Sequence, residues 1–597
     1  MALIDKASLL FVPSVVAEGK AFNILPSGNR APDNKGGAGY DQTRADFDFD
    51  RGSNTAATRV NADGLIEKYR ENLLLQSNAF DTTWASVGAT ETSGQSGYDN
   101  TNNAWLIQST SSNGRIEQNT SYGSGVRTYS VYAKAGTSNI LRIRMQGGAN
   151  AYADFDLSDG SVDYTDSDVI ESKINSVGSG WYRCSINTND TSTKVYIYVI
   201  GASGLNILIQ NTQLESGLVA TDVLTSGATT GKAGVLVDLP RINFDANGEN
   251  GSLLLEPSRT NLNAYSEYID GWSDKINVTL TPNAATSPEG VDNAYKIYPT
   301  ATGSAYFFDS QNLVSGTDYS YSIFVKQDGV RYYQLTTSGG ATSGNNYANF
   351  DLQEGTKAFD SGFDDADIED YGNGWYRIYV VFTAAATGIG RIISTLIDEP
   401  TDGRLGAISK NGTDGSLVYG SVYEAGSYPS SYIPNHGESG GVTRAADLCT
   451  GGGSAESINS TEGVLYAEIS ALAEDVSFKT ICLHDGTNTQ RINIWYWNDG
   501  TFKVDGHNSN VQQFNFDFDA DLTATNKIAV KYKANDFSVF LNGSKMDSDT
   551  SGATPIGLNT LDFRNGNDLY PFYGNVKQLA VFNEALSDSE LATLTTL

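Results

Sequence analysis

The stretches Tyr129-Ser130-Val131-Tyr132-Ala133-Lys134 and Gly180-Trp181-Tyr182-Arg183 decide the fold of this chain, because each of them occurs twice. They recur as Tyr321-Ser322-Ile323-Phe324-Val325-Lys326 and as Gly374-Trp375-Tyr376-Arg377. In both stretches successive side chains alternate between two faces, as they do along a β-strand. A repeated unit of this length is a whole domain and is too long for a solenoid repeat. The sequence therefore predicts two copies of one β-domain, with the repeated tryptophan as a core residue.

Other short motifs recur in the same order along the two copies. Asn72-Leu73 returns as Asn261-Leu262, and Glu215 returns as Glu424. The offset between equivalent residues grows from 189 (261 − 72) to 209 (424 − 215). Because the order of the motifs is kept while the offset grows, we expect the second copy to have gained short loop insertions.

The composition favours β-sheet throughout the chain. The 597 residues include 62 Gly, 33 Tyr and 24 Phe, and only 18% are charged, which is typical of strands separated by glycine-containing turns. The sequence predicts an all-β, multi-domain protein with a short N-terminal anchoring segment. We place the domain boundaries as follows: 1–69 N-terminal segment, 70–221 first repeat, 222–258 connector, 259–436 second repeat, and 437–597 a further β-domain with one C-terminal helix.

The charge balance argues against a polyanionic partner. The chain has 39 basic and 70 acidic residues and a net charge of −31, so it would repel nucleic acid. The three cysteines are dispersed, which favours neither a disulfide framework nor a zinc site. No apolar run is long enough to span a membrane. Residues 7–17 resemble the apolar part of a signal peptide, but Pro13 interrupts them and we expect a retained structural segment.

The motifs of common enzymes are missing from the sequence. There is no Glu-x-Asp-x-x-Glu run of the kind that places two carboxylates for retaining glycoside hydrolysis. The three histidines lie apart, none beside a Gly-x-Ser-x-Gly turn, and there is no phosphate-binding glycine loop. We therefore expect a protein that is not an enzyme.

Two groups of aromatic residues are candidates for contact with a glycan. In the stretch 491–499 the side chains of Asn493, Trp495 and Trp497 share one strand face, where they could stack on sugar rings and bind hydroxyl groups. The alternative, that both tryptophans pack between two sheets, is equally compatible with the alternation. Tyr332 and Tyr333 in the second repeat form a weaker candidate of the same kind.

A run of alternating aspartates is the candidate metal site. Asp517, Asp519 and Asp521 follow one another at every second position, so their carboxylates lie on one side of a strand. The pattern favours a strand with one solvated face. The alternative is a structural Ca²⁺ ion held by these carboxylates, and no other cofactor is expected.

Three resemblances to known families follow from motifs near the ends of the chain and within the repeats. The C-terminal stretches Phe540–Gly543, Tyr573–Val576 and Asn583–Leu591 resemble laminin G-like (concanavalin A-like) jelly-roll domains. The repeats resemble the carbohydrate-binding-module-like jelly rolls of bacteriophage virion proteins, through Asn72–Leu74, Phe155–Leu157 and Gly180–Arg183. The segments 3–9 and 57–67 are similar to the start of fibre proteins of phages that infect Bacteroidetes.

These resemblances imply tandem jelly-roll sandwiches in a head or tail fibre located on the virion. They imply that residues 1–69 bind other virion proteins, that the chain forms a homo-oligomer, expected to be a trimer, and that the jelly rolls contact host surface glycans. A purely architectural capsid or tail component, with no ligand, is one alternative. A secreted polysaccharide-binding protein is the other.

Overall fold

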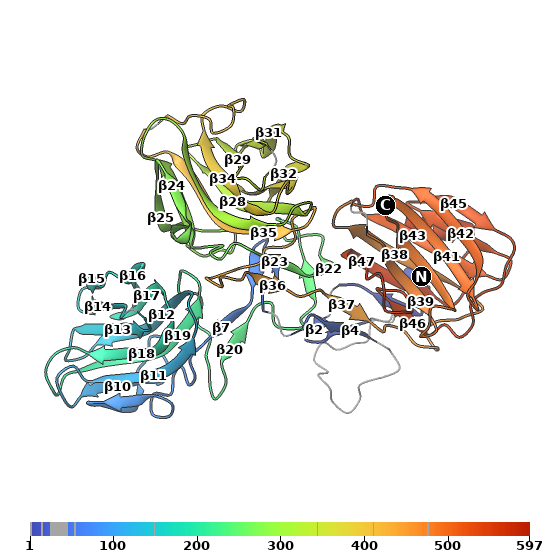
Figure 1. Ribbon diagram of the computed structural model, residues 1–597. Coiled ribbons are helices and arrows are strands. Elements are labelled where there is room, and N and C mark those ends of the chain that lie inside the picture. Colours follow the sequence, from blue (N-terminus) through green and yellow to red (C-terminus); the bar gives the residue numbers. More distant parts are fainter. Residues whose placement is uncertain are drawn as a thin grey trace. The chain divides into compact units, whose positions relative to one another are not determined.

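The computed structural model describes residues 3–13, 16–23, 46–52, 55–148, 150–342, 344–409, 411–474 and 477–597 (Figure 1). Its described residues form β-sandwiches, which confirms the predicted all-β, multi-domain fold. Contacts divide the chain into two compact units. One contains described residues of 1–65, 235–259 and 443–597, and the other contains described residues of 66–234 and 260–442. None of the helices in the described ranges is long and apolar enough to cross a membrane.

The first repeat is a sandwich of two six-stranded antiparallel sheets. The first sheet has the order β16 (Glu171–Gly178), β17 (Trp181–Asn189), β12 (Val126–Ala135), β19 (Asn206–Ser216), β10 (Ala104–Ser109), β9 (Ala89–Gln95). The second has the order β15 (Ser161–Thr165), β14 (Tyr152–Asp156), β13 (Ile140–Gln146), β18 (Ser192–Val199), β11 (Arg115–Tyr122), β8 (Ala85–Val87). Leu141, Ile143 and Met145 of β13 lie in the core between the sheets, so the alternate residues of β13 face outward.

The second repeat has the same strand order in both of its six-stranded sheets. One sheet runs β32 (Asp365–Asp370), β33 (Trp375–Thr383), β28 (Asp318–Asp328), β35 (Gly415–Ala425), β26 (Ala294–Pro299), β25 (Val278–Ala285). The other runs β31 (Thr356–Ser361), β30 (Tyr347–Asp351), β29 (Tyr332–Ser338), β34 (Gly388–Ile397), β27 (Ala305–Leu313), β24 (Asp274–Ile276). Position by position, β29 corresponds to β13, β30 to β14, and β34 to β18.

The repeated motifs have the same structural roles in both copies. The Asn72 side chain donates hydrogen bonds to the carbonyls of Thr212 and Leu224. Asn261 donates in the same way to the carbonyls of Ser421 and Ile433. Trp181 and Trp375 are each only 2% exposed, as expected for core residues. The motifs that revealed the duplication therefore hold the sandwich together.

The C-terminal domain pairs a large sheet with a five-stranded one. The large sheet has the order β21 (Arg241–Asn243), β22 (Ser252–Leu255), β47 (Gly574–Phe582), β38 (Glu462–Ala471), β43 (Asn526–Lys533), β44 (Phe537–Leu541), β45 (Ser544–Asp549), and β1 (Leu9–Phe11) also pairs with β47. The five-stranded sheet has the order β42 (Val511–Asp519), β41 (Thr501–Asn508), β40 (Arg491–Tyr496), β39 (Lys479–His484), β46 (Thr560–Asp562). The predicted C-terminal helix is α1 (Asp588–Thr595), which begins with a capping box formed by Ser587 and Glu590.

The domains of the structure do not follow the consecutive boundaries that the sequence predicts. Strands from the predicted N-terminal segment and from the predicted connector lie in the large sheet of the C-terminal domain. A buried ion network joins the same three segments. Asp447 pairs with Arg51 and Arg241, and Glu256 pairs with Arg241 and Arg444. Burial of three guanidinium groups requires such pairing, because an unpaired charge in the interior is costly.

The remaining elements are short. One four-stranded sheet has the order β2 (Val16–Ala17), β3 (Lys20–Ala21), β4 (Phe47–Asp50), β37 (Leu448–Thr450). In β4 the phenylalanines are buried and the aspartates are exposed, as the alternation in the sequence indicates. The others are η1 (Leu3–Lys6), η3 (Ile269–Gly271), β5 (Thr58–Val60), β6 (Ile66–Lys68), β7 (Arg70–Asn72), β20 (Gly231–Ala233), β23 (Arg259–Asn261) and β36 (Val442–Arg444).

Candidate functional site

The predicted glycan residues of β40 do share one face of the strand. Ile492, Ile494 and Tyr496 point into the core between the sheets. Asn493 and Trp495 therefore point away from that core, so the tryptophan does not pack between the sheets. However, Asn493 is completely buried and Trp495 is only 7% exposed.

The polar atoms of this face are bound to one another around Asp505 of β41. The Asn493 side chain donates to Asp505 Oδ1 over 2.6 Å, and Trp495 Nε1 donates to the same oxygen over 3.2 Å. His507 Nε2 lies 3.2 Å from Asp505 Oδ2, and Arg491 lies 3.8 Å from it. Burial opposes ionisation of Asp505, but these hydrogen bonds and the Arg491 charge outweigh it and lower its pKa.

The two tryptophans of this face belong to an aromatic cluster. The rings of Trp495 and Trp497 meet edge to face with centroids 5.7 Å apart. Phe478 lies 4.5 Å from Trp497, and Tyr570 lies 5.6 Å from Trp495. The Lys503 ammonium lies 4.6 Å from the centre of the Trp497 ring. Asn493 and Trp495 are thus engaged within the domain, and ligand binding by Asn493, Trp495 and Trp497 stays a prediction.

The other predicted residues do not come together into sites. Tyr333 is completely buried in the core of the second repeat, whereas Tyr332 lies on the opposite face of β29 under the guanidinium of Arg331, 5.1 Å from its ring centre. The two tyrosines therefore share no surface. Side chains lie on the same face of a strand only when they are an even number of positions apart, and Tyr332 and Tyr333 are adjacent.

The aspartates proposed for Ca²⁺ lie on the surface of the C-terminal domain. Asp517 is 3.5 Å from Lys503, and Asp521 accepts hydrogen bonds from Thr523 and Ala524 in a turn. Asp519 is exposed at the end of β42. Within the described ranges, no three His, Cys, Asp or Glu side chains are grouped closely enough to hold a metal ion. The arrangement is that of a solvated strand face.

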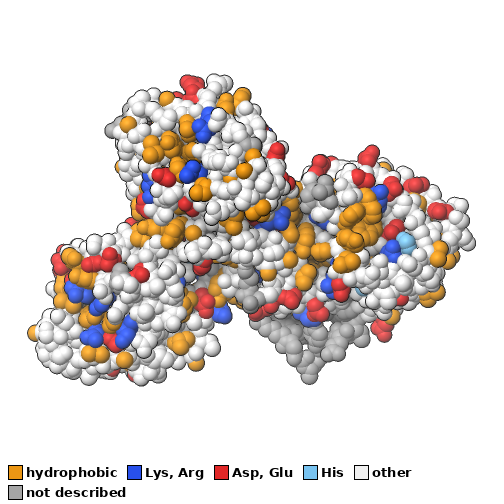
Figure 2. Space-filling model, in the orientation of Figure 1, with side chains coloured by type: hydrophobic (Ala, Val, Ile, Leu, Met, Phe, Trp, Pro, Cys, Tyr) orange, Lys and Arg blue, Asp and Glu red, His pale blue; other side chains and the backbone are white. Residues whose placement is uncertain are grey.

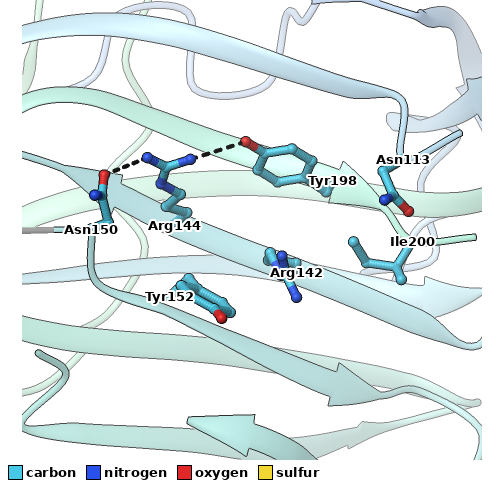
Figure 3. A pocket seen from close by; sticks show the side chains of 7 residues that line it. All are labelled: Asn113, Arg142, Arg144, Asn150, Tyr152, Tyr198 and Ile200. Carbon is cyan, nitrogen blue, oxygen red and sulfur yellow. Dashed lines mark hydrogen bonds between the residues drawn. The ribbon is translucent and has the colours of Figure 1, made fainter. Parts of the chain in front are cut away.

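A cavity formed by none of the predicted site residues lies on the outward face of the second sheet in the first repeat (Figure 3). Its volume is about 290 Å³. The lining comes from β13, β14, β18 and the segments beside them: Asn113, Arg142, Arg144, Asn150, Tyr152, Tyr198 and Ile200. The antiparallel register sets Arg142 beside Tyr198 on one neighbouring strand and Arg144 beside Tyr152 on the other.

The two arginines of the cavity are held in place by different partners. Arg142 Nε and Nη2 donate to the two oxygens of Asp154 over 2.6 and 2.8 Å, and its guanidinium lies 4.2 Å from the centre of the Tyr152 ring. The hydrogen bond to Asp154 raises the pKa of Arg142. Arg144 donates to Asn150 and, over 3.5 Å, to the Tyr198 hydroxyl, as Figure 3 shows.

Further basic and aromatic residues surround the cavity on the same face. Tyr196 and Tyr198 stack with centroids 5.7 Å apart, and the Arg115 guanidinium lies 5.5 Å from the centre of Tyr198. Lys194 Nζ pairs with Glu117 over 2.7 Å. In Figure 2, Lys and Arg side chains gather among hydrophobic ones over this repeat. The face is therefore both aromatic and basic, in a chain whose net charge is −31.

A signal for this cavity was present in the sequence. In the run 140–146 the apolar Leu141, Ile143 and Met145 alternate with Arg142, Arg144 and Gln146, which predicts a strand with a polar outward face. The run does not show which strands lie beside it. The tyrosines that complete the cavity come from strands whose register only the structure gives.

The second repeat covers the corresponding face with its own chain. Gln334 and Asn349 occupy the positions of Arg142 and Asp154, and both are completely buried. Asn349 donates to the carbonyls of Pro400 and Asp402, over 2.9 Å in each case. Gln334 donates to the Gly403 carbonyl over 3.0 Å. The connection between β34 and β35 thus lies over the sheet, whereas β18 and β19 are joined by residues 200–205 only.

Comparison with known proteins supports one part of the sequence interpretation. Residues 471–592 match the family model of the Concanavalin A-like lectin/glucanases superfamily, which confirms the predicted lectin-like β-sandwich at this end of the chain. The matched segment is a minor part of the 597 residues, and it assigns no ligand or activity to the whole chain. No curated protein matches the chain.

Among solved structures, the chain is similar to a carbohydrate-binding module of a Ruminococcus gnavus IT-sialidase bound to alpha2,3 sialyllactose. The identity is 20%, over 23% of this chain and 84% of that chain, with a TM-score of 0.21. A leech intramolecular trans-sialidase is 21% identical over 23% of this chain, with a TM-score of 0.21, but only 24% of that enzyme is covered. At such TM-scores these likenesses carry no argument about function.

Proposed function

We propose that this protein binds glycans and that the cavity on β13, β14 and β18 of the first repeat is a saccharide site. The observation that carries the proposal is the lining of that cavity. Tyr152 and Tyr198 offer ring surface on which a sugar can stack, and Arg142, Arg144 and Asn150 offer donors for its oxygens. A volume of about 290 Å³ lies near the lower end of the range for small-ligand pockets, which suits one or two sugar residues.

The test is a glycan array probed with the full chain and with a matched pair of variants. Tyr152 and Tyr332 both lie under an arginine that is paired with an aspartate, Arg142 with Asp154 and Arg331 with Asp351. Tyr152→Ala removes a wall of the cavity, whereas Tyr332→Ala removes a tyrosine with the same kind of arginine contact from the second repeat, outside this cavity. We expect the first variant to lose glycan binding and the second to keep it. Retention of no glycan by the unmodified chain would refute the proposal.

We also propose that the protein acts as a non-enzymatic fibre component of a phage virion, as the resemblance of its N-terminal segments implies. Because β1 pairs with β47, the described residues of 1–65, most of the segment expected to bind other virion proteins, belong to the same unit as the lectin-like domain. We therefore assign particle attachment to this unit and glycan contact to the first repeat. Repetition of the chain as a homo-oligomer, a trimer in this proposal, would raise the avidity of a weak site.

Purified phage particles test this second proposal. We expect mass spectrometry to find the chain in intact virions, and antibodies against the first repeat to label the particle exterior and to block adsorption to host cells. A mass determined in solution under native conditions should correspond to three chains. Recovery of the chain only as a secreted product of uninfected cells would overturn the virion assignment while leaving the glycan site untouched.

A further inference from the structure

We propose that the ligand of the cavity in the first repeat is an anionic saccharide, bound through its carboxylate by Arg144 and Arg142. This inference rests on the proposed function and specifies the chemical class of the glycan. It comes from the charge of the cavity, from the hydrogen-bonding capacity of its two guanidinium groups, and from the corresponding face of the second repeat.

The charge of the cavity is opposite to that of the chain. Its lining residues include two arginines and no carboxylate, although the chain carries 70 acidic and only 39 basic residues. Asp154 offsets the charge of Arg142 through a bidentate pair. Arg144 has no such counter-ion, since its hydrogen-bond partners in the described part of the chain are Asn150 and Tyr198. One uncompensated cation therefore lines the cavity.

Both guanidinium groups retain capacity for a further acceptor. Asp154 occupies Nε and Nη2 of Arg142, and within the described ranges Nη1 has no hydrogen-bond partner. Arg144 Nη1 makes only a long contact, 3.5 Å, with the Tyr198 hydroxyl. A guanidinium accommodates the two oxygens of a carboxylate better than it does a single hydroxyl.

The fold does not require arginines at these positions. In the second repeat the positions of Arg142 and Arg144 are occupied by Gln334 and Thr336, and the strands pair in the same order. Both are buried: Gln334 bonds to the connection between β34 and β35, and Thr336 donates to the carbonyl of Asn346. The arginines of the first repeat are therefore explained by what they face in the open cavity, and the sandwich forms without them.

The tyrosines determine the kind of anion. An inorganic anion would need only the charge, whereas Tyr152 and Tyr198 place ring surface on two sides of the arginines. Aromatic surface beside a cation suits a ligand that combines an apolar ring face with an acidic group. A uronic or sialic acid residue has both, and a sulfated sugar shares the chemistry through a different acidic group.

The experiment uses an array on which each carboxylate-bearing oligosaccharide is printed beside its carboxyl-reduced form, together with sulfated neutral sugars. We expect the full chain to bind carboxylate forms, and to bind their reduced forms about tenfold or more weakly. Arg144→Gln should weaken binding by a similar factor, and Arg144→Lys should restore part of it. Arg331→Gln, which removes an arginine from the second repeat, is the matched control and should leave binding unchanged.

Each outcome bears on a different statement. Equal binding of acidic and reduced forms, or unchanged binding by Arg144→Gln, would overturn the anionic inference while the glycan-binding proposal stands. Binding to sulfated sugars alone would overturn the carboxylate assignment. Binding to no sugar of any kind would refute the proposed function itself. A circular dichroism spectrum and thermal midpoint of Arg144→Gln equal to those of the unmodified chain show that a loss of binding is not a loss of fold.

Discussion

The two repeats have the same strand order in their sheets, but their corresponding outward faces differ in exposure and in residue type. In the first repeat, the face of β13, β14 and β18 is open and carries arginine and tyrosine around a cavity. In the second, the same face carries Gln334 and Asn349, buried under the connection between β34 and β35. Duplication thus kept the residues that hold the sandwich together and left the outward face free to diverge. The function of each repeat therefore depends on its outward face, because the shared fold alone does not specify a function.

The largest expected effect on the stability of the repeats comes from truncating a buried core residue. Tyr333 of the second repeat occupies the position of Leu141 and is completely buried, whereas its neighbour Tyr332 faces outward. Tyr333→Ala should destabilise the second repeat by about 3–5 kcal/mol, because it leaves a large cavity. Leu141→Ala should destabilise the first by about 2–5 kcal/mol. Urea denaturation followed by tryptophan fluorescence measures both.

Tyr332→Ala is the control for that prediction, with an expected cost of about 1 kcal/mol or less, since the residue is only half-buried. A cost of Tyr332→Ala as large as that of Tyr333→Ala would contradict the placement of the two tyrosines on opposite faces.

The repeats should also differ in their response to acid. Glu267 of the second repeat accepts hydrogen bonds from Lys68 over 2.8 Å and from Tyr432 over 2.9 Å, whereas the equivalent residue of the first repeat is Asn78. Burial opposes ionisation of Glu267, but the charges of Lys68 and His436 and the hydrogen bonds from Lys68 and Tyr432 together outweigh it and lower the pKa to about 2. A lowered carboxyl pKa stabilises the fold above the unfolded value of about 4.5, and this contribution is lost as the pH falls towards 2.

We expect the second repeat to lose on the order of 3 kcal/mol between pH 5 and pH 2 through Glu267. Protonation of Glu289, whose pKa is raised by burial, offsets part of that loss. Urea denaturation at a series of pH values measures the slope, and Glu267→Gln should flatten it. An acid dependence that is unchanged in Glu267→Gln would show that this carboxylate is not the source.

How far the sequence could predict this molecule depends on the distance between the residues concerned. Local patterns predicted the β-strands, the C-terminal helix and the shared face of Asn493 and Trp495. The cavity depends on register, because Arg142 and Tyr198 meet only through the pairing of β13 with β18. The insertion in the second repeat was visible, since the offset rises from 194 (377 − 183) to 209 (424 − 215) between two motifs. The sequence did not show where the inserted segment packs.

A smaller effect tests whether the connection between β34 and β35 is held by the sheet face beneath it. Asn349→Ala removes two hydrogen bonds to the carbonyls of Pro400 and Asp402 and should cost about 1–3 kcal/mol. The equivalent change in the first repeat, Asp154→Ala, removes a partly exposed ion pair with Arg142 and should cost about 1 kcal/mol or less. Hydrogen exchange should accelerate across 398–409 in the first variant. If protection of that segment stays unchanged, these hydrogen bonds do not hold it.

The smallest expected difference concerns a feature that the repeats share. Gly160 and Gly355 have φ angles of +78° and +65°, and a Cβ on either would lie 2.5 Å from a ring carbon of Tyr182 or Tyr376. Substitution by alanine should destabilise each repeat by about 1–3 kcal/mol, since both the backbone conformation and the tyrosine contact exclude a side chain.

The two costs should agree within about 0.5 kcal/mol, because the conformations and the contacts are nearly identical. Urea denaturation of the two variants measures this difference directly. A clear inequality would mean that the repeats have diverged in their turns as well as on their outward faces. In that case the second repeat could not serve as the structural reference against which Arg142 and Arg144 are assigned to a ligand.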